Sequence, residues 1–289
     1  MIKVSKGRRL RLAALVGAAL VMLAACGEED DGAGGTGGTG GDDAATEAPE
    51  FEILEEGVLT VGSCLDYRPF EYFEKGADEP TGFDVELTNA IAEELGLEVK
   101  WVRANFDTIF TAVAAGEFDM VAAASTITPE RQEVVDFSDP YYNARQALTV
   151  TTESGTSSTD ELGEGDTVGV QKGTTGKAWA EENLAPQGVE IKTFDVVPDA
   201  FTDLESGAIE GVINDEPSSA AEIEDRPGLE IVERIDTNEN YGFAFSKENP
   251  DLTLAVNEAL QAVIDDGTYE EIFQKYFPGT EVPEEFRAA

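Results

Sequence analysis

The sequence FDMVAAASTITPER, residues 118–131, joins a buried strand directly to the start of a helix. Residues 118–124 are short and mostly apolar, which predicts a strand covered on both faces. Thr128 is a good N-cap and Pro129 a good first helical residue, so we expect a short helix to begin here. A strand followed at once by a helix is the unit from which α/β folds are built.

Outward from this unit, short β-rich runs alternate with helical ones, which predicts an α/β fold. On the N-terminal side we expect strands at residues 58–64 and 97–102 and helices at 83–95 and 107–115. On the C-terminal side we expect strands at 166–171, 189–194 and 209–214, and helices at 174–184, at 198–206 and from near Pro217.

Two extended stretches, residues 141–152 and 241–245, separate the alternating halves, and two helices follow the second stretch. They indicate that the chain builds one lobe, crosses to a second and returns, so the two crossing strands form a hinge. We expect lobe 1 to comprise residues 51–147 and 243–289, and lobe 2 residues 148–242. The cleft between two such lobes is the natural ligand site.

The N-terminus has the pattern of an export signal. A basic start is followed by an apolar run that ends at Ala25 and is shorter than the roughly 20 residues of a membrane-spanning helix, so residues 1–25 are predicted to be a signal peptide. Cys26 follows Leu23, Ala24 and Ala25 and resembles the cysteine of a bacterial lipobox, which implies lipidation. A plain secretory signal with an incidental cysteine is the alternative.

Residues 26–50 contain no aromatic or branched aliphatic side chain, so beyond Cys26 they are predicted to form a disordered, acidic, Gly-rich linker. Together with a lipidated Cys26, this linker predicts a protein anchored by lipid to the extracytoplasmic face of the cell membrane.

Composition excludes several classes of function. With 60 acidic against 19 basic residues and a formal net charge of −41, binding to nucleic acid through a basic face is excluded. There is no histidine and there are two cysteines, of which Cys26 is predicted to be lipidated. Histidine-dependent catalysis and zinc sites are therefore not expected, nor is any other metal or cofactor. Cys64 is expected to be a free, partly buried thiol.

Arg131 is the first candidate for ligand binding. It lies one turn into the helix that Thr128 begins, where backbone N–H groups and the planar guanidinium suit a carboxylate. The Thr126 hydroxyl is a further donor at the same place. The alternative is an ordinary capped helix whose Arg131 forms a salt bridge.

Two features of the second half complement this anion site. Residues 173–176, GTTG, form a turn of small residues between a strand and a helix, where glycines allow close backbone approach and hydroxyls can donate to an anion. Asp215 ends a predicted strand and can pair with an ammonium group, although such residues often only form turns or caps. A carboxylate site and an ammonium partner on opposite lobes fit the zwitterion of an α-amino acid.

Several motifs, in this order, resemble those of family 3 bacterial extracellular solute-binding proteins, the polar amino-acid receptors of ABC importers. They are LTVG at 59–62, YRPFE at 67–71, GFDVEL at 82–87, ITPER at 127–131, DFSDPYY at 136–142 and GTT at 173–175. The resemblance covers residues 58–277 and implies a two-lobed periplasmic-binding-protein-like fold of type II.

The resemblance also implies roles for individual residues. Arg131 would hold the ligand carboxylate, helped by Thr126, the backbone at Ala124, and Thr175 of the second lobe. Asp215 would bind the ligand ammonium.

Residues around the ligand side chain follow from the same resemblance. Tyr67 and Phe106 would sandwich that side chain, or else belong to the core. Cys64 departs from the family, which often has an Asp there, so a strictly basic ligand is not implied. Asp66, Glu71 and Gln171 are nearby candidates for side-chain recognition, and we expect a polar or basic L-amino acid.

The implied mechanism is closure of the lobes around the ligand, followed by delivery to an ABC permease. We expect a monomeric binding protein and no enzyme activity. Two alternatives remain: an enzyme of the same fold resembling cyclohexadienyl dehydratases, with Glu71 or Asp215 as the acid, and a ligand-sensing domain for a membrane receptor.

Overall fold

The computed structural model describes residues 51–288. The predicted signal peptide, the lipidation site Cys26 and the linker that ends at residue 50 lie outside the described residues. Within the described range, no helix combines the length and the apolar character that crossing a membrane requires.

The first lobe is built on a five-stranded sheet of mixed direction. In spatial order its strands are β2 (Glu98–Arg103), β1 (Val58–Ser63), β3 (Met120–Val121), β10 (Ala244–Phe245) and β4 (Asp136–Phe137). Strand β1 pairs in parallel with β2 and β3, whereas β10 runs antiparallel to β3 and β4. A strand from near the C-terminus therefore completes a sheet that the N-terminal part of the chain begins.

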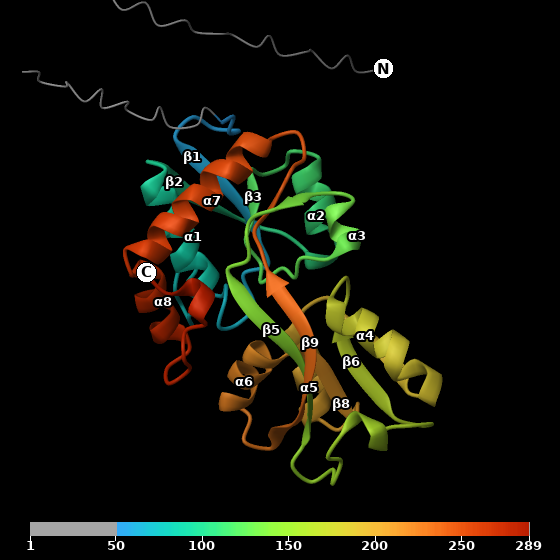
Figure 1. The fold of residues 1–289 in the computed structure, drawn as a ribbon. Helices are drawn as coiled ribbons and strands as arrows, with labels where there is room; N and C mark the ends of the chain where they lie inside the picture. Colours follow the sequence, from blue (N-terminus) through green and yellow to red (C-terminus); the bar gives the residue numbers. More distant parts are fainter. Residues whose placement is uncertain (1–50, 289) are drawn as a thin grey trace, which may run out of the picture. The chain divides into compact units, whose positions relative to one another are not determined.

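Five helices accompany this sheet (Figure 1). They are α1 (Phe83–Glu94), α2 (Phe106–Ala114), α3 (Pro129–Gln132), α7 (Pro250–Asp265) and α8 (Thr268–Tyr276). Helices α1, α7 and α8 pack against one another, and their shared core is aromatic. The Phe83 ring lies 6.3 Å from that of Tyr141, 5.7 Å from Tyr269 and 6.0 Å from Phe273.

The second lobe has its own five-stranded sheet and three α-helices. Its strands, in spatial order, are β7 (Glu190–Phe194), β6 (Thr167–Gln171), β8 (Gly211–Asp215), β5 (Tyr142–Thr151) and β9 (Leu229–Tyr241). The helices are α4 (Thr175–Asn183), α5 (Val197–Glu205) and α6 (Glu216–Glu224), and short 3₁₀ turns lie at Thr159–Glu161 and Ala185–Gln187. A further 3₁₀ turn, Glu284–Phe286, packs against Tyr269 in the first lobe. The predicted two-lobed α/β fold is confirmed.

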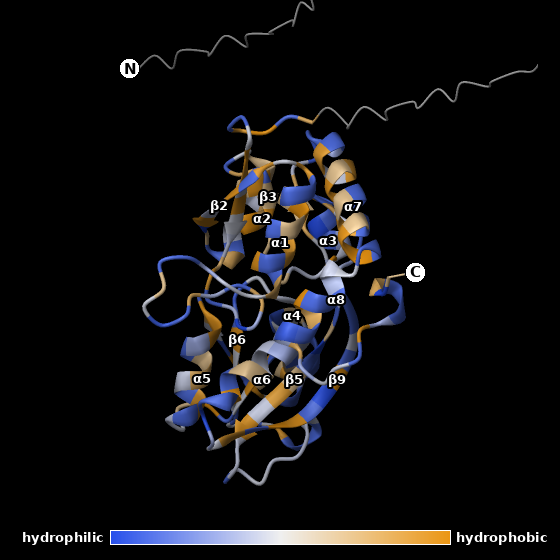
Figure 2. Cartoon of the chain, turned by 90° about the vertical axis from the view of Figure 1, so that its left-hand side faces the viewer, coloured by the Kyte–Doolittle hydropathy of each residue, from blue (hydrophilic) through white to orange (hydrophobic). Residues whose placement is uncertain are grey.

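Strands β5 and β9 carry the chain between the lobes as a long antiparallel pair, from Tyr142 opposite Tyr241 to Thr151 opposite Leu229 (Figure 1). The return crossing was predicted at 241–245, but the strand already begins at Leu229. It is the edge strand of its sheet, so many of its side chains are polar and the apolar pattern is weak. Figure 2 shows β9 largely hydrophilic. The predicted lobe boundaries, which fall within β5 and directly after β9, stay predictions.

The predicted strand at 118–124 is also corrected, because only Met120–Val121 pairs as a strand. Ala124 has a backbone φ of 44°, in the left-handed region, and this turns the chain out of the sheet. Its N–H donates to Oδ2 of the buried Asp84 at 2.8 Å. The apolar run after Val121 is buried as a turn, which its composition alone does not distinguish from a strand.

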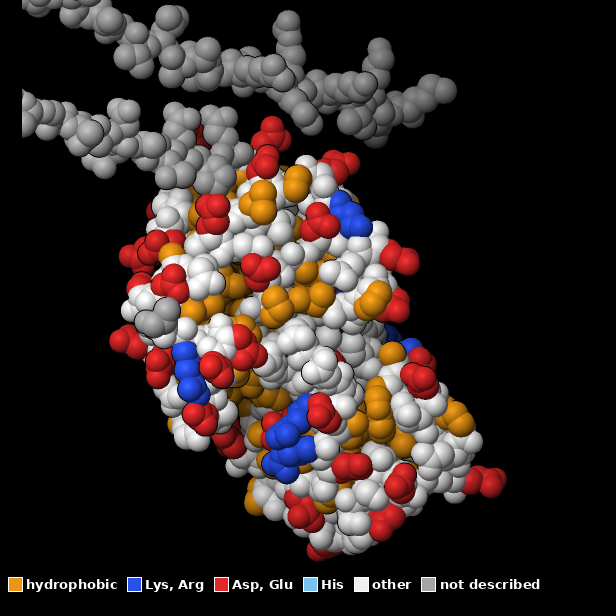
Figure 3. All heavy atoms as spheres, viewed as in Figure 1, with side chains coloured by type: hydrophobic (Ala, Val, Ile, Leu, Met, Phe, Trp, Pro, Cys, Tyr) orange, Lys and Arg blue, Asp and Glu red, His pale blue; other side chains and the backbone are white. Residues whose placement is uncertain are grey.

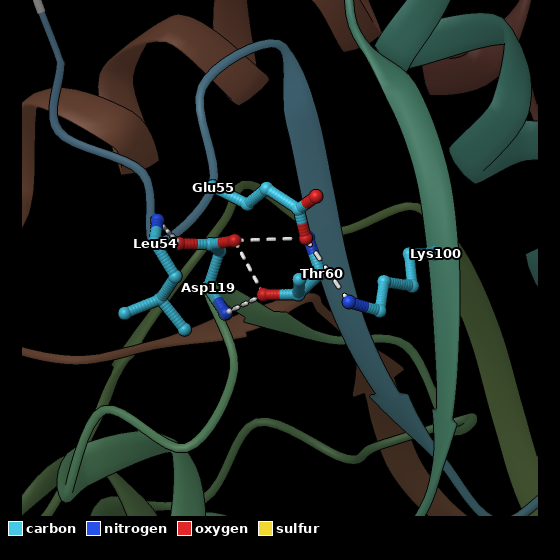
Figure 4. Close-up of polar contacts among 5 residues, drawn as sticks. All are labelled: Leu54, Glu55, Thr60, Lys100 and Asp119. Atoms are coloured by element: carbon cyan, nitrogen blue, oxygen red, sulfur yellow. Dashed lines mark hydrogen bonds and ion pairs between the residues drawn. The ribbon is translucent and has the colours of Figure 1, made fainter.

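A buried acid ties the start of the described chain to the first sheet (Figure 4). Asp119 Oδ1 accepts the backbone N–H of Leu54 at 2.8 Å, and Oδ2 accepts the N–H of Thr60 at 2.8 Å and its hydroxyl. Beside this cluster, Lys100 Nζ pairs with Glu55 Oε2 at 3.0 Å. These bonds hold the segment that precedes β1 in place.

The surface reflects the acidic composition. Figure 3 shows acidic side chains spread over the viewed face, with few Lys and Arg side chains among them. The viewed face is therefore predominantly acidic.

Candidate functional site

One cavity between the lobes brings together nine residues predicted to contact the ligand. The first lobe contributes six of them and the second lobe three: Cys64, Tyr67, Phe106, Ala124, Thr126 and Arg131, then Gln171, Thr175 and Asp215. Glu71, Ala123 and Thr174 complete the lining, and the space not filled by atoms is about 320 Å³, including the part open to solvent. The roles of these residues in binding stay predictions, but their convergence is a fact of the fold.

Arg131 projects from α3 toward the cavity and is held by backbone carbonyls of both lobes. Its Nη1 donates to Thr126 O at 2.6 Å, and its Nη2 donates to Gly173 O at 3.1 Å. The guanidinium carbon lies 5.2 Å from the centre of the Phe106 ring and 4.6 Å from that of Phe110. Burial lowers the pKa of Arg131 to about 10, so it remains charged at neutral pH. A guanidinium has further N–H groups that can still bind an anion.

The turn at Gly173 brings the second lobe close to the first. Gly173 has a φ of 75°, and a Cβ there would lie 3.0 Å from Asp107 Cα in the first lobe. Only glycine fits both the left-handed backbone and this approach. Thr174 then caps α4 by accepting the N–H of Lys177 at 3.1 Å. The backbone at Gly173 does approach another group closely, as predicted, and that group belongs to the first lobe.

Asp215 ends β8 and occupies the position before α6, where its side chain forms no capping bond. Its Oδ2 instead accepts the hydroxyls of Tyr67 at 2.7 Å and Tyr241 at 2.5 Å, and its Oδ1 accepts Gln146 Nε2. Burial, and after it the charge of Glu239, raise the pKa of Asp215 to about 6, while the three hydrogen bonds oppose the shift. Asp215 is therefore a buried acceptor in the cavity wall.

The two predicted aromatic residues both line the cavity, with different neighbours. Phe106 lies beside the guanidinium of Arg131 and also meets Phe110 edge to face at 5.6 Å. Tyr67 stacks on Phe70 at 6.1 Å and extends its hydroxyl across the cleft to Asp215. Tyr67 thus joins the lobes through a contact that the sequence did not indicate.

The backbone at Ala124 differs from its predicted role. Its N–H is already bonded to Asp84, so that N–H is not available to a ligand carboxylate. Only the Ala124 carbonyl remains, and a carbonyl accepts hydrogen bonds, as an ammonium group requires. At this cavity the Ala124 backbone can therefore accept a hydrogen bond but not donate one.

The hydroxyls of the two predicted threonines also already donate hydrogen bonds within the protein. Thr126 Oγ1 and Thr175 Oγ1 both donate to Glu239 Oε2, at 2.6 and 2.7 Å. A hydroxyl carries a single proton, so in this arrangement neither can donate to an anion. Glu239 was missed because it lies in a polar run of β9 that resembles a loop; its only signal was an acid beside a predicted crossing.

One end of the cavity is acidic and uncompensated. Glu71 is fully buried, and neither of its carboxylate oxygens has a hydrogen-bond partner among the described residues. Burial raises the pKa of Glu71 well above its ordinary value, and the charges of Asp84, Asp66 and Asp215 add to this. Cys64 is buried beside it, and burial raises the pKa of that thiol.

Of the two remaining candidates for side-chain recognition, one lines the cavity and the other does not. Asp66 pairs with Arg103 at 3.3 Å and is not part of the cavity lining. Gln171 lines the cavity and donates from Nε2 to Asp195 O at 3.1 Å. No group of acidic or cysteine side chains within residues 51–288 is arranged to hold a metal ion.

Comparisons with known proteins agree with this fold. The sequence profile of the bacterial extracellular solute-binding proteins, family 3, matches residues 59–279. A probable histidine-binding protein of Neisseria gonorrhoeae is 34% identical over 224 residues, which are 76% of this chain and 83% of that protein.

Two solved structures are similar over most of their length. An ancestral arginine-binding protein bound to arginine is 37% identical, with a TM-score of 0.73 over 76% of this chain and 98% of the other. An ancestral amino acid-binding protein, a precursor of cyclohexadienyl dehydratase, is also 37% identical, with a TM-score of 0.71 over 76% of this chain and 96% of the other. The chain belongs to the bacterial extracellular solute-binding proteins of family 3.

Proposed function

We propose that this chain is the extracytoplasmic substrate-binding lipoprotein of an amino-acid ABC importer. It binds a polar or basic L-amino acid between its lobes and closes to deliver it to the permease. One observation carries the proposal: Arg131 of the first lobe and Asp215 of the second line the same cavity. Opposite charges on opposite lobes match the two charges of an amino-acid head group.

The head group is recognised by complementary donors and acceptors. The free N–H groups of Arg131 bind the ligand carboxylate, while Asp215 and the Ala124 carbonyl accept the ammonium protons. Because the charges sit on different lobes, the ligand bridges them and favours the closed arrangement. We assign the hinge to the long strands β5 and β9, which carry the chain between the lobes.

Glu71 favours a basic side chain within the proposed class. A buried carboxylate without partners is costly, and a cationic guanidinium or ammonium at that end of the cavity would offset the cost. Similarity to the arginine-bound ancestral protein supports the same choice. Cys64 contributes no charge there, so Glu71 is the acid to which we assign side-chain recognition.

L-Arginine and L-lysine are therefore expected to raise the melting temperature more than other amino acids, since a ligand that binds only the folded state stabilises it. In Glu71→Gln the affinity for L-arginine, measured by calorimetry, is expected to fall about thirtyfold or more, because a buried ion pair is lost. Glu74→Gln removes the same charge from an exposed side chain of the same loop and should bind as the wild type does. A thermal-shift screen in which no amino acid raises the melting temperature would refute the proposal.

Binding is also expected to depend on pH through Asp215. Its pKa is raised to about 6, so below that pH the neutral carboxyl predominates and attracts the ligand ammonium less. The contribution of Asp215 to the affinity should therefore rise as pH increases through about 6 and then level off, changing about tenfold per pH unit on the acid side.

Titration calorimetry between about pH 5 and pH 8 measures this dependence. The control is Asp66→Asn, because the pKa of Asp66 is also about 6 but its side chain is outside the cavity lining. That variant should keep the full step, and a wild-type affinity that is constant over this range would contradict the role of Asp215.

Anchoring and partners follow from the sequence. We assign lipidation to Cys26 and place the monomeric binding domain on the extracytoplasmic face of the cell membrane, within reach of its permease. Metabolic labelling with a fatty acid, compared between the wild type and Cys26→Ala, tests the anchor. Label in both proteins, or in neither, would contradict it.

A second candidate is an enzyme of the same fold. Glu71 favours it, because a buried carboxyl with a raised pKa can act as a general acid in a cleft. Incubation with prephenate or arogenate distinguishes the two, since only the enzyme forms an aromatic product. We favour the binding protein because the similar protein of Neisseria gonorrhoeae is named as a probable histidine-binding protein.

A further inference from the structure

Glu239 is a buried acid in the hinge strand β9 that the proposed ligand contacts do not use. Strand β5 places Ala144 opposite Glu239 and Gln146 opposite Ile235, so β9 carries additional residues between these pairs. This irregularity allows β9 to direct a side chain out of the regular ladder. The Glu239 side chain is buried among groups that border the cleft.

The carboxylate of Glu239 accepts hydrogen bonds from both lobes. Its Oε2 accepts Thr126 Oγ1 of the first lobe at 2.6 Å and Thr175 Oγ1 of the second lobe at 2.7 Å. Its Oε1 accepts Gln146 Nε2 at 3.0 Å and Thr237 Oγ1 at 2.7 Å, both from the crossing strands. A single oxygen atom therefore joins the turn after β3 to the first residue of α4.

The two bonds to Oε2 require the lobes to be together. Thr126 follows the sheet of the first lobe and Thr175 begins a helix of the second, so any opening that separates them breaks at least one bond. Both bonds have an ionised acceptor, which makes them stronger than bonds between neutral groups. Glu239 itself is not part of the cavity lining, so its effect on a ligand is indirect.

We propose that Glu239 is a latch between the lobes that stabilises the closed conformation through the hydroxyls of Thr126 and Thr175. The inference rests on the proposed binding of an amino acid in the cleft. A contact made only in the closed state shifts the equilibrium toward that state and tightens binding without touching the ligand. Because release of the ligand requires opening, the latch acts mainly by slowing dissociation.

If the ligand displaced Glu239 from the threonine hydroxyls, removing the charge of Glu239 would change the affinity in the opposite direction. If the ligand carboxylate took the two hydroxyl protons in the bound state, Glu239 would compete with the ligand, and removing its charge would tighten binding. The direction of the change in affinity therefore separates a latch from a competitor.

The test compares Glu239→Gln with the wild type, using L-arginine as the probe. Glutamine has the same size and one acceptor oxygen but no charge, so the fold is expected to persist, as circular dichroism and the melting temperature will check. We expect the affinity to fall about tenfold, with a faster dissociation rate and a nearly unchanged association rate in stopped-flow measurements. Unchanged or tighter binding overturns the latch.

A matched control lies on the same strand. Glu233 Oε2 accepts the N–H of Thr159 at 2.7 Å, and both residues belong to the second lobe. Glu233→Gln removes the same charge from β9 without affecting a bond between the lobes, so its affinity should equal that of the wild type. An equal loss in both variants would assign the effect to net charge and overturn the latch.

A double-mutant cycle tests the route through the threonines. Thr126→Val and Thr175→Val keep the side-chain shape and remove the hydroxyls, so in a variant carrying both changes Glu239→Gln should have little further effect. A tenfold loss that persists in that background overturns the latch.

Failure of the latch and failure of the proposed function give different results. If the wild type binds L-arginine, the latch is decided by the comparisons above. If it binds a different amino acid in the thermal-shift screen, that amino acid replaces L-arginine as the probe. If it binds none of the amino acids, the proposed function fails, and the latch fails with it.

Discussion

Replacing Arg131 with alanine is expected to abolish measurable amino-acid binding while the fold remains intact. Among residues 51–288 the guanidinium is the one cationic group in the lining of the cavity, so without it a ligand carboxylate would be buried without a counter-charge. Truncating one partner of a buried charge pair typically costs about 2 to 5 kcal/mol, or a loss of affinity from about thirtyfold to several thousandfold. Isothermal titration calorimetry measures the loss.

The fold should tolerate this change because Arg131 is not a core residue. It lies on a four-residue helix, and its hydrogen bonds go to two backbone carbonyls at the cleft. Arg131→Lys keeps the charge but loses the planar fork, so intermediate affinity is expected. Arg234→Ala, which removes an exposed arginine paired with Glu216, is the control and should bind normally. Undiminished affinity in Arg131→Ala would rule out the carboxylate assignment.

Asp215→Asn is expected to weaken binding about a hundredfold, for two reasons that act together. The variant loses the charge that attracts the ligand ammonium, a loss within the range for a buried charge pair. It also replaces one acceptor oxygen by an NH₂ group. Tyr67 and Tyr241 donate to one oxygen of Asp215 and Gln146 to the other, so the new NH₂ faces a donor in either orientation.

The control for this change is Asp203→Asn in the same lobe. Asp203 pairs with Lys192 on the surface and is not part of the cavity lining, so its removal should leave the affinity unchanged. Binding by Asp215→Asn should also lose the dependence on pH near 6. An affinity within twofold of the wild type would contradict the assignment of Asp215 to the ammonium.

The chemistry of the site was predictable where it depends on local sequence. Thr128 and Pro129 favour the start of a helix through local interactions alone. This start places Arg131 in the first turn of the helix, next to the end of the preceding strand. Asp215 and the turn at Gly173 follow buried strands in the same way. In α/β folds the carboxyl ends of parallel strands meet at one edge, so residues that follow them converge. Nine predicted residues and the further candidate Glu71 therefore line one cavity, whereas the candidate Asp66 does not.

Errors arose where the partner of a group lies far away in the chain. The apolar run 118–124 was expected to continue as a strand, but Ala124 turns out of the sheet with its N–H bonded to Asp84. The crossing strand β9 was expected to be short because an edge strand with polar side chains lacks a strong apolar alternation. In both cases the segments of the same chain that pack alongside decided which conformation was stable.

The sequence by itself determined the two-lobed α/β fold and the residue types of the site, because strand and helix patterns and cap residues act locally. Only the tertiary structure decided which hydrogen bonds those residues make. Thr126 and Thr175 both line the cavity, but their protons go to Glu239, which is 113 residues from the first and 64 from the second. A hydroxyl proton serves one acceptor at a time, and which acceptor lies within reach depends on how the two lobes meet.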